Sequence, residues 1–507
     1  MRPSRLAAWL GCVMTLGGVA FAEPRFDPVA VPEHIYSGGW EYFVGGGIAA
    51  FDCDGDSLPE LFAAGGEIPA VLLRNQSETG GTVAFAANTP DALVLTGVIG
   101  AYPLDIDNDG LLDLAILRVG PNLLMKGGTD CSFAPFPNLA LPTDDDWTTA
   151  FSATWEAGQT LPTLAFGNYV DRANPDGPFE ACDDSLLFRP NGANYPAPIT
   201  LKPGFCTLSM LFSDWGRQGR ADLRVSNDRH YYVSGGQEQM WAMEQTPRLY
   251  DENDGWQSYR LWGMGIASRD ISGDGLPEVY LTSMGDQHLQ MLDGDDGPRY
   301  RVATYDRGTT AHRPYTGGDG RPSTGWHVAF GDVQNDGRDD IFIAKGNVEQ
   351  MPGLAMKDPN SLLVQNADGT FSEAGGLAGL ASMHRGRGAA LVDLNADGLL
   401  DLAVVNRRAP LEVYQNMTDG AGHWLSVALS QPAPNRNAVG AWIELRTDDR
   451  IIAREVTVGG GHAGGTAVPE HFGVGDAGAV DLRIIWPDGS IGDWETVVSN
   501  QAITINH

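Results

Sequence analysis

The stretch 105–113 has the sequence DIDNDGLLD and places four carboxylates within nine residues. Asp105, Asp107, Asp109 and Asp113 stand at positions 1, 3, 5 and 9, so a tight turn can direct them at one centre. Carboxylates this close repel one another without a cation, and Ca²⁺ prefers about six to eight oxygen ligands. The carbonyl of Leu111, at position 7, would supply another oxygen. The alternative is a solvated acidic turn, because Asn-Asp-Gly is also ordinary turn chemistry.

The same pattern occurs four more times, which favours calcium over solvated turns. The further copies are DCDGDSLPE from Asp52, DISGDGLPE from Asp270, DVQNDGRDD from Asp332 and DLNADGLLD from Asp393. We therefore expect about five Ca²⁺ ions, one in each loop. The predicted metal ligands, at positions 1, 3, 5 and 9 of the five loops, are Asp52, Asp54, Asp56, Glu60, Asp105, Asp107, Asp109, Asp113, Asp270, Ser272, Asp274, Glu278, Asp332, Gln334, Asp336, Asp340, Asp393, Asn395, Asp397 and Asp401.

Two further copies have lost part of the pattern. DWGRQGRAD keeps Asp214 and Asp222 at positions 1 and 9, but has Gly216 and Gln218 at positions 3 and 5. WEAGQTLPT, from Trp155, has no carboxylate at any of the four ligand positions. We expect no ion in the Trp155 loop, and the sequence leaves open whether the Asp214 loop binds one.

Short stretches of small and apolar residues stand on both sides of each loop, such as GGGIAAF (45–51) before the first and LFAAGG (61–66) after it. Such stretches predict strands, so each loop would join two neighbouring antiparallel strands. The seven copies start at positions 52, 105, 155, 214, 270, 332 and 393, a period of roughly 50–60 residues that is typical of propellers. The sequence therefore predicts an all-β fold, a seven-bladed β-propeller with about four strands in each blade.

These repeats resemble the FG-GAP (VCBS-type) repeats of integrin α-subunit propellers, from about Gly38 to Asn416. The alternating stretches from Trp424 onwards predict a small β-rich module. This module resembles the ASPIC/UnbV domain in the words NRNAVGA (435–441), HFGVG (471–475) and WPDG (486–489). The two parts together resemble the cartilage acidic protein family, which implies a secreted, acidic, calcium-binding protein without a defined biochemical activity. We predict the propeller over 23–420 and the ASPIC/UnbV-like domain over 421–507.

The N-terminus predicts a secretory signal peptide over 1–22, because Arg2 and Arg5 precede a short apolar run that ends in small residues. We therefore expect an exported protein, secreted or periplasmic, without membrane insertion after cleavage. The net charge of −32 makes nucleic acid an improbable partner.

Four cysteines remain after cleavage and allow three pairings. We predict Cys53–Cys131 and Cys182–Cys206, since each pair then joins the same or adjacent blades.

The sequence contains no GxSxG, HExxH or Walker motif, and therefore names no catalytic residue. Gly459, Gly461 and Gly464 form a GxGxxG, but no helix pattern follows, so we interpret these glycines as a turn rather than a nucleotide site. We predict a binding or adhesion protein in which calcium is structural. The alternatives are a carbohydrate-active enzyme on the same propeller, since paired carboxylates can hydrolyse glycans, and an envelope assembly factor.

The topology places all the metal loops on one face of the ring, so the opposite face collects the starts of the inner strands and the ends of their neighbours. Arg, His and Trp gather there, and these side chains suit carboxylates and sugars. We expect this face to bind an anionic glycan or an extracellular protein with an acidic segment; the alternative is blade packing and a solvated rim. The residues concerned are Trp40, Asn168, Asn227, Asp228, Arg229, His230, Trp262, Trp326, His327, Asn347, His384, Arg385, Arg387, Asn406 and Arg407.

Overall fold

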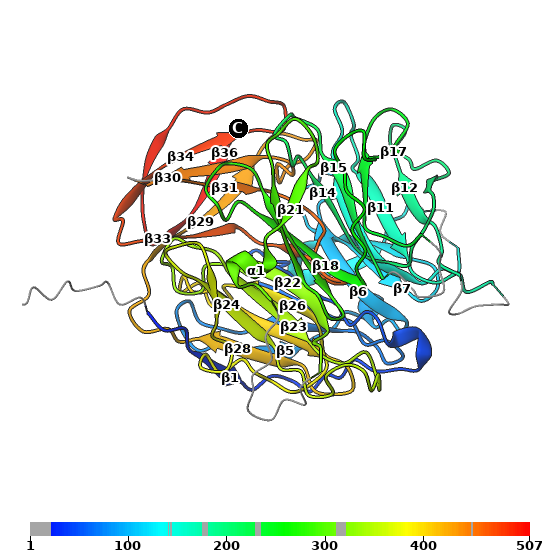
Figure 1. Cartoon of the computed structure of the whole chain (residues 1–507), viewed down its shortest axis with the longest axis horizontal. Coiled ribbons are helices and arrows are strands. Elements are labelled where there is room, and N and C mark those ends of the chain that lie inside the picture. Colours follow the sequence, from blue (N-terminus) through cyan, green and yellow to red (C-terminus); the bar gives the residue numbers. More distant parts are fainter. Residues whose placement is uncertain are drawn as a thin grey trace, which may run out of the picture.

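Seven antiparallel blades form a ring around a central channel in the computed structural model, which confirms the predicted seven-bladed propeller. Six of these sheets have four strands, and the first gains a fifth strand from the C-terminal part. The blades are shown in Figure 1. The structure describes residues 22–139, 141, 144–174, 181–228, 235–310, 321–447 and 450–507. Nearly all of the predicted signal peptide therefore lies outside the described residues, as do Arg229 and His230. Among the described residues, no helix is both long enough and apolar enough to span a bilayer.

Each of the first four blades runs outward from the channel in chain order, with every strand antiparallel to the one before it. The first blade consists of β2 (Ile48–Phe51), β3 (Glu60–Ala63), β4 (Val71–Asn75) and β5 (Phe85–Ala87). The second consists of β6 (Val98–Leu104), β7 (Asp113–Arg118), β8 (Leu123–Gly127) and β9 (Phe133–Pro135). The third consists of β10 (Thr148–Thr154), β11 (Thr163–Asn168), β12 (Ser185–Phe188) and β13 (Ile199–Leu201). The fourth consists of β14 (Thr207–Ser213), β15 (Asp222–Asn227), β16 (Gln239–Ala242) and β17 (Arg248–Leu249).

The last three blades repeat this plan, and the seventh closes the ring with a strand from the N-terminus. The fifth consists of β18 (Gly263–Arg269), β19 (Glu278–Ser283), β20 (His288–Leu292) and β21 (Tyr300–Val302). The sixth consists of β22 (Gly325–Gly331), β23 (Asp340–Lys345), β24 (Ser361–Gln365) and β25 (Phe371–Glu373). The seventh consists of β26 (Gly386–Val392), β27 (Asp401–Asn406), β28 (Glu412–Asn416) and, outermost, β1 (Phe26–Val29). The described helical turns are η1 (Trp40–Tyr42), η2 (Asp91–Leu93), η3 (Thr129–Cys131) and α1 (Thr304–Arg307).

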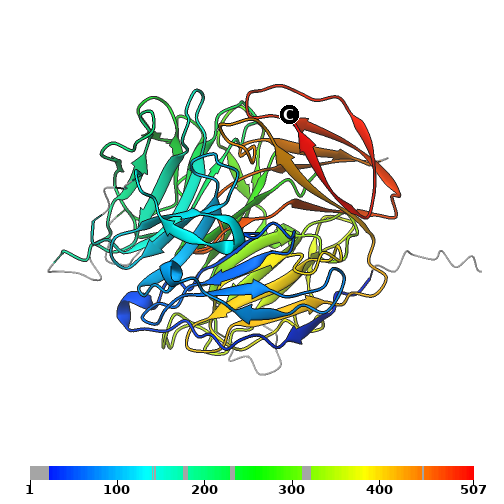
Figure 2. The same cartoon turned by 180° about the vertical axis from the view of Figure 1, so that it is seen from behind.

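The C-terminal part forms two further sheets around their own apolar core, which includes Leu425, Ile443, Leu445 and Phe472. One sheet has the order β33-β29-β36 and the other β31-β30-β34-β35. Figure 2 shows these strands, in orange and red, gathered beside the blades. Their bounds are β29 (His423–Ser430), β30 (Trp442–Arg446), β31 (Ile451–Glu455), β32 (Thr466–Ala467), β33 (Glu470–Gly475), β34 (Ala479–Ile485), β35 (Glu495–Val498) and β36 (Gln501–Asn506).

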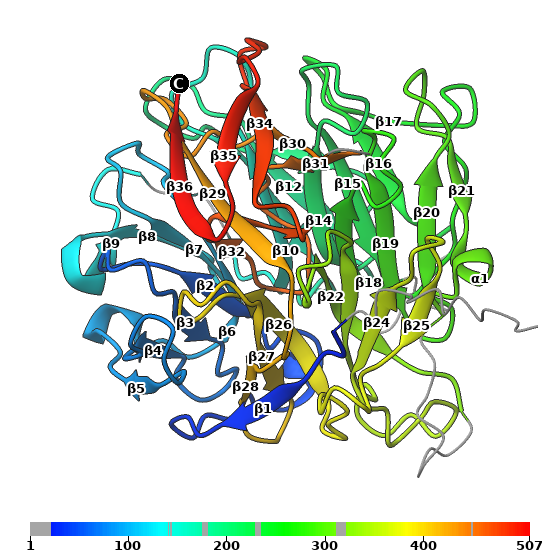
Figure 3. The same cartoon turned by 90° about the vertical axis from the view of Figure 1, so that its left-hand side faces the viewer.

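The short strand β32 leaves these sheets and pairs in parallel with β2, the innermost strand of the first blade (Figure 3). The preceding residues form single bridges to other inner strands: Val458 to Ala153, Gly459 to Leu211 and Gly461 to Ile266. Residues 458–467, called the channel segment below, therefore lie at the centre of the ring. The interpretation of Gly459, Gly461 and Gly464 as a turn is wrong in this respect, because the glycines lie against the backbones of several blades.

Both predicted disulfides are present. Cys53 is bonded to Cys131 and Cys182 to Cys206. The first bond ties the first metal loop to the turn between β8 and β9, so it links adjacent blades. Disulfides persist in oxidising compartments, which agrees with the expectation of export.

Candidate metal centres and the loop face

The five predicted metal loops share one hydrogen-bond pattern, and the second loop shows it clearly. The carboxylate of Asp105, at position 1, accepts from the backbone N–H groups of Asp109 (3.1 Å) and Gly110 (3.0 Å). Asp109, at position 5, accepts from the N–H of Leu111 at 2.9 Å. A local turn of this kind needs only the residues of the loop itself, which is why the sequence predicts it.

The carboxylate at position 9 connects each loop to its blade. Asp113 is fully buried at the start of β7, and its two oxygens accept from the N–H of Ile106 (2.8 Å) and of Gly127 in β8 (2.7 Å). Asp401 makes the equivalent bonds with Leu394 (2.9 Å) and Asn416 (2.7 Å) in the seventh blade. The carboxylate at position 9 therefore fixes the loop to the second and third strands of its own blade. The same carboxylate faces the centre of the loop, towards the other predicted ligands.

Burial makes the negative charge of these carboxylates costly. It raises the pKa of Glu60 and of Asp113 to about 7, and that of Glu278 to about 8. Neighbouring carboxylates of the same loops raise these pKa values further. A site that disfavours several negative charges in this way favours any cation that enters it.

Four of the loops hold a buried oxygen at a ligand position without a hydrogen-bond partner among the described residues. Buried polar atoms in native proteins almost always have a partner, so an unpartnered oxygen indicates a water or an ion. In the first two loops, three ligand carboxylates also lie within 4.8 Å of one another. These donors are all oxygens, as calcium requires, and the residues present fit the ion. The unpartnered oxygens are Asp107 Oδ1, Glu278 Oε1, Gln334 Oε1 and Asn395 Oδ1.

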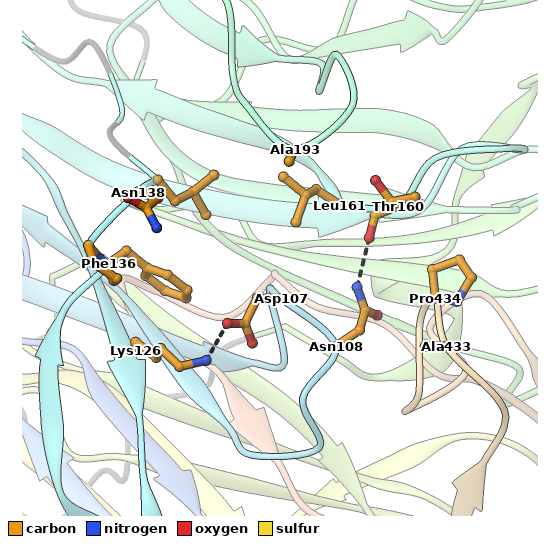
Figure 4. A pocket seen from close by; sticks show the side chains of 12 residues that line it. Asp107, Asn108, Lys126, Phe136, Asn138, Thr160, Leu161, Ala193, Ala433 and Pro434 are labelled. Carbon is orange, nitrogen blue, oxygen red and sulfur yellow. Dashed lines mark hydrogen bonds and ion pairs between the residues drawn. The ribbon is translucent and has the colours of Figure 1, made fainter.

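Basic side chains from the third strands approach two of these loops. Lys126 Nζ, in β8, donates to Asp107 and to Asp109 (2.6 Å), and Arg74, in β4, donates to Asp54 at 2.5 Å. Figure 4 shows Lys126 directed at Asp107, beside a cavity of about 580 Å³ that Phe136 and Leu161 also line. These cations offset part of the carboxylate repulsion and would compete with a metal for the same oxygens.

The two incomplete loops are held by protein groups instead. In the fourth blade, Asp222 accepts from the indole of Trp215 (3.0 Å) and the hydroxyl of Tyr250 (2.7 Å), and pairs with Arg220 (3.1 Å). Asp214 keeps its two backbone bonds, and no carboxylate stands at position 3 or 5 of this loop. The protein itself therefore provides partners for Asp222 through these three side chains.

The C-terminal domain covers the loop face. Asn108, at position 4 of the second loop, donates to Thr160 O at 2.7 Å (Figure 4). Its own Oδ1 accepts from the N–H of Asn435 at 2.6 Å. Its carbonyl accepts from Arg436 Nε at 2.7 Å. In the sixth blade, Asn335 Oδ1 accepts from His471 Nε2 at 2.8 Å. The words NRNAVGA and HFGVG thus carry residues that contact the metal loops.

The channel segment extends from the same face into the ring. Gly460 N donates to Met210 O (2.6 Å) and Gly461 N to Ile266 O (2.7 Å). His462 is fully buried: Nδ1 donates to Met264 O at 3.2 Å, and Nε2 accepts from Gly45 N at 3.2 Å. Burial lowers the pKa of His462 to about 3, so the imidazole is neutral, as these two bonds require. The sequence pattern of this segment does not predict its position inside the ring.

Glycines on the inner strands are the sequence feature from which this contact could have been predicted. A Cβ at Gly47 would lie 1.8 Å from Ala463 O, and one at Gly100 would lie 1.5 Å from the same atom. Glycine allows two backbones to approach this closely, whereas any side chain would prevent it. Such a glycine in a strand pattern indicates close backbone approach, although nothing in the sequence names the partner.

On the face opposite the loops, several residues that were expected to bind a ligand are buried instead. Trp326 and Arg387 are fully buried, and the guanidinium of Arg387 stacks on the Trp326 ring at 3.9 Å from its centroid. Arg407 is also buried and donates to backbone carbonyls of the N-terminal segment, including Gly38 O at 3.2 Å. These residues serve packing, which was the alternative. Asn168, Asn227, Asp228, His327, Asn347 and Asn406 are buried as well.

Part of that face remains accessible. Trp40 is 42% exposed and stacks on Phe43 at 4.7 Å between ring centroids. The side chain of Arg408 is 49% exposed, and Arg385 is partly exposed. Arg385, Arg407 and Arg408 all pair with the single carboxylate of Glu349, so positive charge is in excess at this point.

Comparison with known proteins agrees with the predicted C-terminal domain and with the predicted resemblance to cartilage acidic protein. Residues 431–507 match the family model described as ASPIC and UnbV. Cartilage acidic protein 1 of Homo sapiens is 29% identical over 192 residues, which cover 35% of this chain and 26% of that protein. Cartilage acidic protein 1 of Xenopus tropicalis is 31% identical over 202 residues, covering 36% and 28%. These matches confirm the predicted relationship to this family. The chain spans about a quarter of the length of these relatives.

Solved structures are similar only at the level of general shape. BBS1N in complex with ARL6DN superposes with a TM-score of 0.43 at 11% identity, covering 78% of this chain and 98% of that one. An Agrocybe aegerita lectin, described as recognising non-reducing terminal N-acetylglucosamine, superposes with a TM-score of 0.40 at 14% identity, covering 74% and 94%. At these scores neither structure bears on the function of this chain.

Proposed function

We propose that this relative of the cartilage acidic protein family is an exported calcium-binding β-propeller that binds an extracellular partner, with calcium in a structural role. One observation supports the calcium part above the others: at ligand positions of four loops, a buried oxygen has no partner among the described residues. Asp107 Oδ1 and Asn395 Oδ1 are examples, in loops that also contain buried carboxylates. A Ca²⁺ ion would satisfy these oxygens and offset the repulsion within each loop.

Calcium affinity and stoichiometry test this part directly. Extracellular modules commonly bind calcium with Kd values of about 10⁻⁴–10⁻³ M, so we expect saturation at millimolar calcium. We expect equilibrium dialysis of the mature protein to give about five ions per chain, and calcium to raise the thermal unfolding midpoint above that in EGTA. Binding of no ion, together with identical unfolding in the two buffers, would show that the loops are acidic turns.

The partner-binding part concerns the accessible region around Trp40, Arg385 and Arg408. Three guanidiniums share one carboxylate there, and an exposed indole lies on the neighbouring η1 turn. Guanidinium groups suit carboxylates and sulfates, and an indole face suits a sugar ring. We therefore favour an anionic glycan or an acidic protein segment as the ligand.

Retention on an anionic polysaccharide column, compared with a neutral one, tests this assignment. The double variant R385Q/R408Q should elute at lower salt than the wild type, because it removes two partly exposed charges. The matched control is R446Q/R483Q, which removes two arginines that contact Trp494 on the C-terminal domain. Equal retention of wild type and R385Q/R408Q would refute the assignment without affecting the calcium proposal.

A further inference from the structure

Residues between the metal ligands make the contacts with the C-terminal domain. Asn108 and Asn335 stand at position 4 of their loops, between the ligands at positions 3 and 5, and both have a left-handed backbone, with φ of 61° and 56°. Asn108 bonds to Asn435 and Arg436. In the sixth blade, Asn335 O accepts from Gly475 N at 2.8 Å, and Gln334 O accepts from Gly422 N at 2.9 Å. The direction of these groups depends on the conformation of the loop.

The fourth blade provides an internal comparison, because its loop contacts the C-terminal domain without the ligands for an ion. Glu455 accepts from Ser213 Oγ (2.6 Å) and Asp214 N (2.7 Å), and Arg217, at position 4, pairs with Glu444 at 2.6 Å. This loop is already held by hydrogen bonds and an ion pair to Asp222. Its contact with the C-terminal domain therefore needs no cation.

The loops of the second and sixth blades have weaker internal support. Lys126 pairs with Asp107 and Asp109, and Arg338 with Asp336. At position 9, however, Asp113 and Asp340 accept hydrogen bonds from backbone N–H groups only, among the described residues. Asp107 and Asp109 flank Asn108, while Gln334 and Asp336 flank Asn335. Without a cation, the repulsion among the carboxylates of a loop favours wider conformations, and these move the position 4 residue away from its partner. With a cation, positions 3 and 5 are drawn to one centre and position 4 is fixed between them.

We infer that calcium in the loops of the second and sixth blades tightens the docking of the C-terminal domain and, with it, the seating of the channel segment in the ring. This inference rests on the proposed calcium binding and adds a coupling between the two domains. Coupling is reciprocal, so docking also raises the calcium affinity of these two loops. The first loop has no hydrogen bond to the C-terminal domain among the described residues, so docking should affect its affinity less, through the pairing of β32 with β2 alone.

Hydrogen–deuterium exchange of the full mature chain measures this coupling. The amides of Gly460, Gly461 and Gly465 donate to propeller carbonyls, so they exchange only when the channel segment leaves the ring. We expect exchange at these amides to be slower in calcium than in EGTA by about 5–150-fold, the usual range of coupling between sites. Amides between β30 and β34, inside the C-terminal domain, should change much less and serve as the internal reference.

A pair of glycine variants tests whether the exchange rates measure how firmly the channel segment is held in the ring. A Cβ at Gly464 would lie 2.2 Å from Ile48 O in β2, whereas a Cβ at Gly478 would meet nothing within 4 Å. We expect G464A to accelerate exchange of the channel segment in both buffers, because the clash with a strand backbone cannot be relieved by a side-chain movement. G478A should behave as the wild type.

A second pair of variants tests whether the coupling between calcium and domain docking passes through Asn335. N335G removes the side chain that bonds to His471 but leaves every ligand of the loop, and glycine accepts the left-handed backbone. A396G makes the same change at position 4 of the seventh loop, where φ is 55° and no hydrogen bond to the C-terminal domain is present among the described residues. N335G should reduce the calcium effect on the channel segment at least fivefold, and A396G should not.

Calcium dialysis on the same samples separates the possible outcomes. Unchanged exchange at the channel segment with about five bound ions would overturn the coupling and leave the calcium proposal intact. If calcium slows exchange of the channel segment equally in N335G and in the wild type, the inference is also overturned, because the effect would then arise outside these contacts. The absence of any bound ion would overturn both.

Discussion

Replacing Asp113 by Asn should change stability in calcium but hardly at all in EGTA. Asp113 is fully buried, and its two oxygens accept from Ile106 N and Gly127 N. An amide keeps one acceptor and places its NH₂ group against the other donor, a change that costs about 1–3 kcal/mol. The same substitution removes a buried negative charge, which burial already disfavours, since it raises the pKa of this carboxyl to about 7. In EGTA the two effects have opposite signs and largely cancel.

In calcium the variant also loses a metal ligand. At about 10 mM calcium, which is about 100 times a Kd of about 10⁻⁴ M, a filled site stabilises the folded protein by about 2.7 kcal/mol, and D113N should lose most of this. The stabilisation by calcium, measured from the midpoint of urea unfolding in the two buffers, should therefore be smaller for D113N by about 2 kcal/mol or more.

Asp222 offers a matched control, because it occupies position 9 of a loop that lacks the other ligands. D222N keeps one oxygen, so either Met243 N or both Trp215 and Tyr250 lose their acceptor, and the variant should destabilise the protein by about 1–3 kcal/mol in both buffers alike. The reasoning fails if D113N and D222N show the same stabilisation by calcium as the wild type, or if both lose it equally.

Two further predictions concern charged side chains at the loop face. Burial raises the pKa of Glu455 to about 8, above its ordinary value, so the docked domain binds more protons than the undocked one; docking in EGTA should weaken as the pH rises towards 8. E455Q, which keeps a neutral group facing Asp214 and Arg217, should flatten that pH profile of channel-segment exchange, and an unchanged profile would contradict the assignment. K126Q removes an ammonium that competes for Asp107 and Asp109, so calorimetry should give a higher calcium affinity for the second loop, by about 2–5-fold; a lower affinity would contradict the competition.

Local patterns explain how much of the molecule the sequence could predict. The loop from Asp105 to Asp113 is built from hydrogen bonds among its own residues, and the strands beside it follow from short apolar stretches. Seven copies at a regular period then fix the number of blades, and adjacency in the ring makes the pairing of Cys53 with Cys131 predictable. The bound ions and the partner remain predictions that only binding experiments can test.

Long-range contacts explain what the sequence did not predict. β1 closes the ring by pairing with β28, yet the residues FDPV carry no trace of the repeat. The channel segment lies hundreds of residues away from the strands it contacts, so only the glycines on both sides hint at the contact. Trp326 and Arg387 lie at the starts of the inner strands β22 and β26, as predicted. His462 and the N-terminal segment cover them, and the periodicity of the sequence does not reveal such a cover.

The two incomplete loops indicate what calcium would do for the fold. In the third blade, Glu156 pairs with Arg189 at 2.8 Å and accepts from Thr163, which stands at position 9. In the fourth, Arg220 pairs with Asp222. Each incomplete loop thus replaces the cation with a side chain of the protein, so ring closure through these blades does not depend on metal. Removal of calcium should therefore loosen five loops and the domain docked on them while two adjacent blades stay fixed. On the calcium proposal, bound ions would set how firmly the C-terminal domain is held, whereas the disulfides and apolar cores maintain the ring.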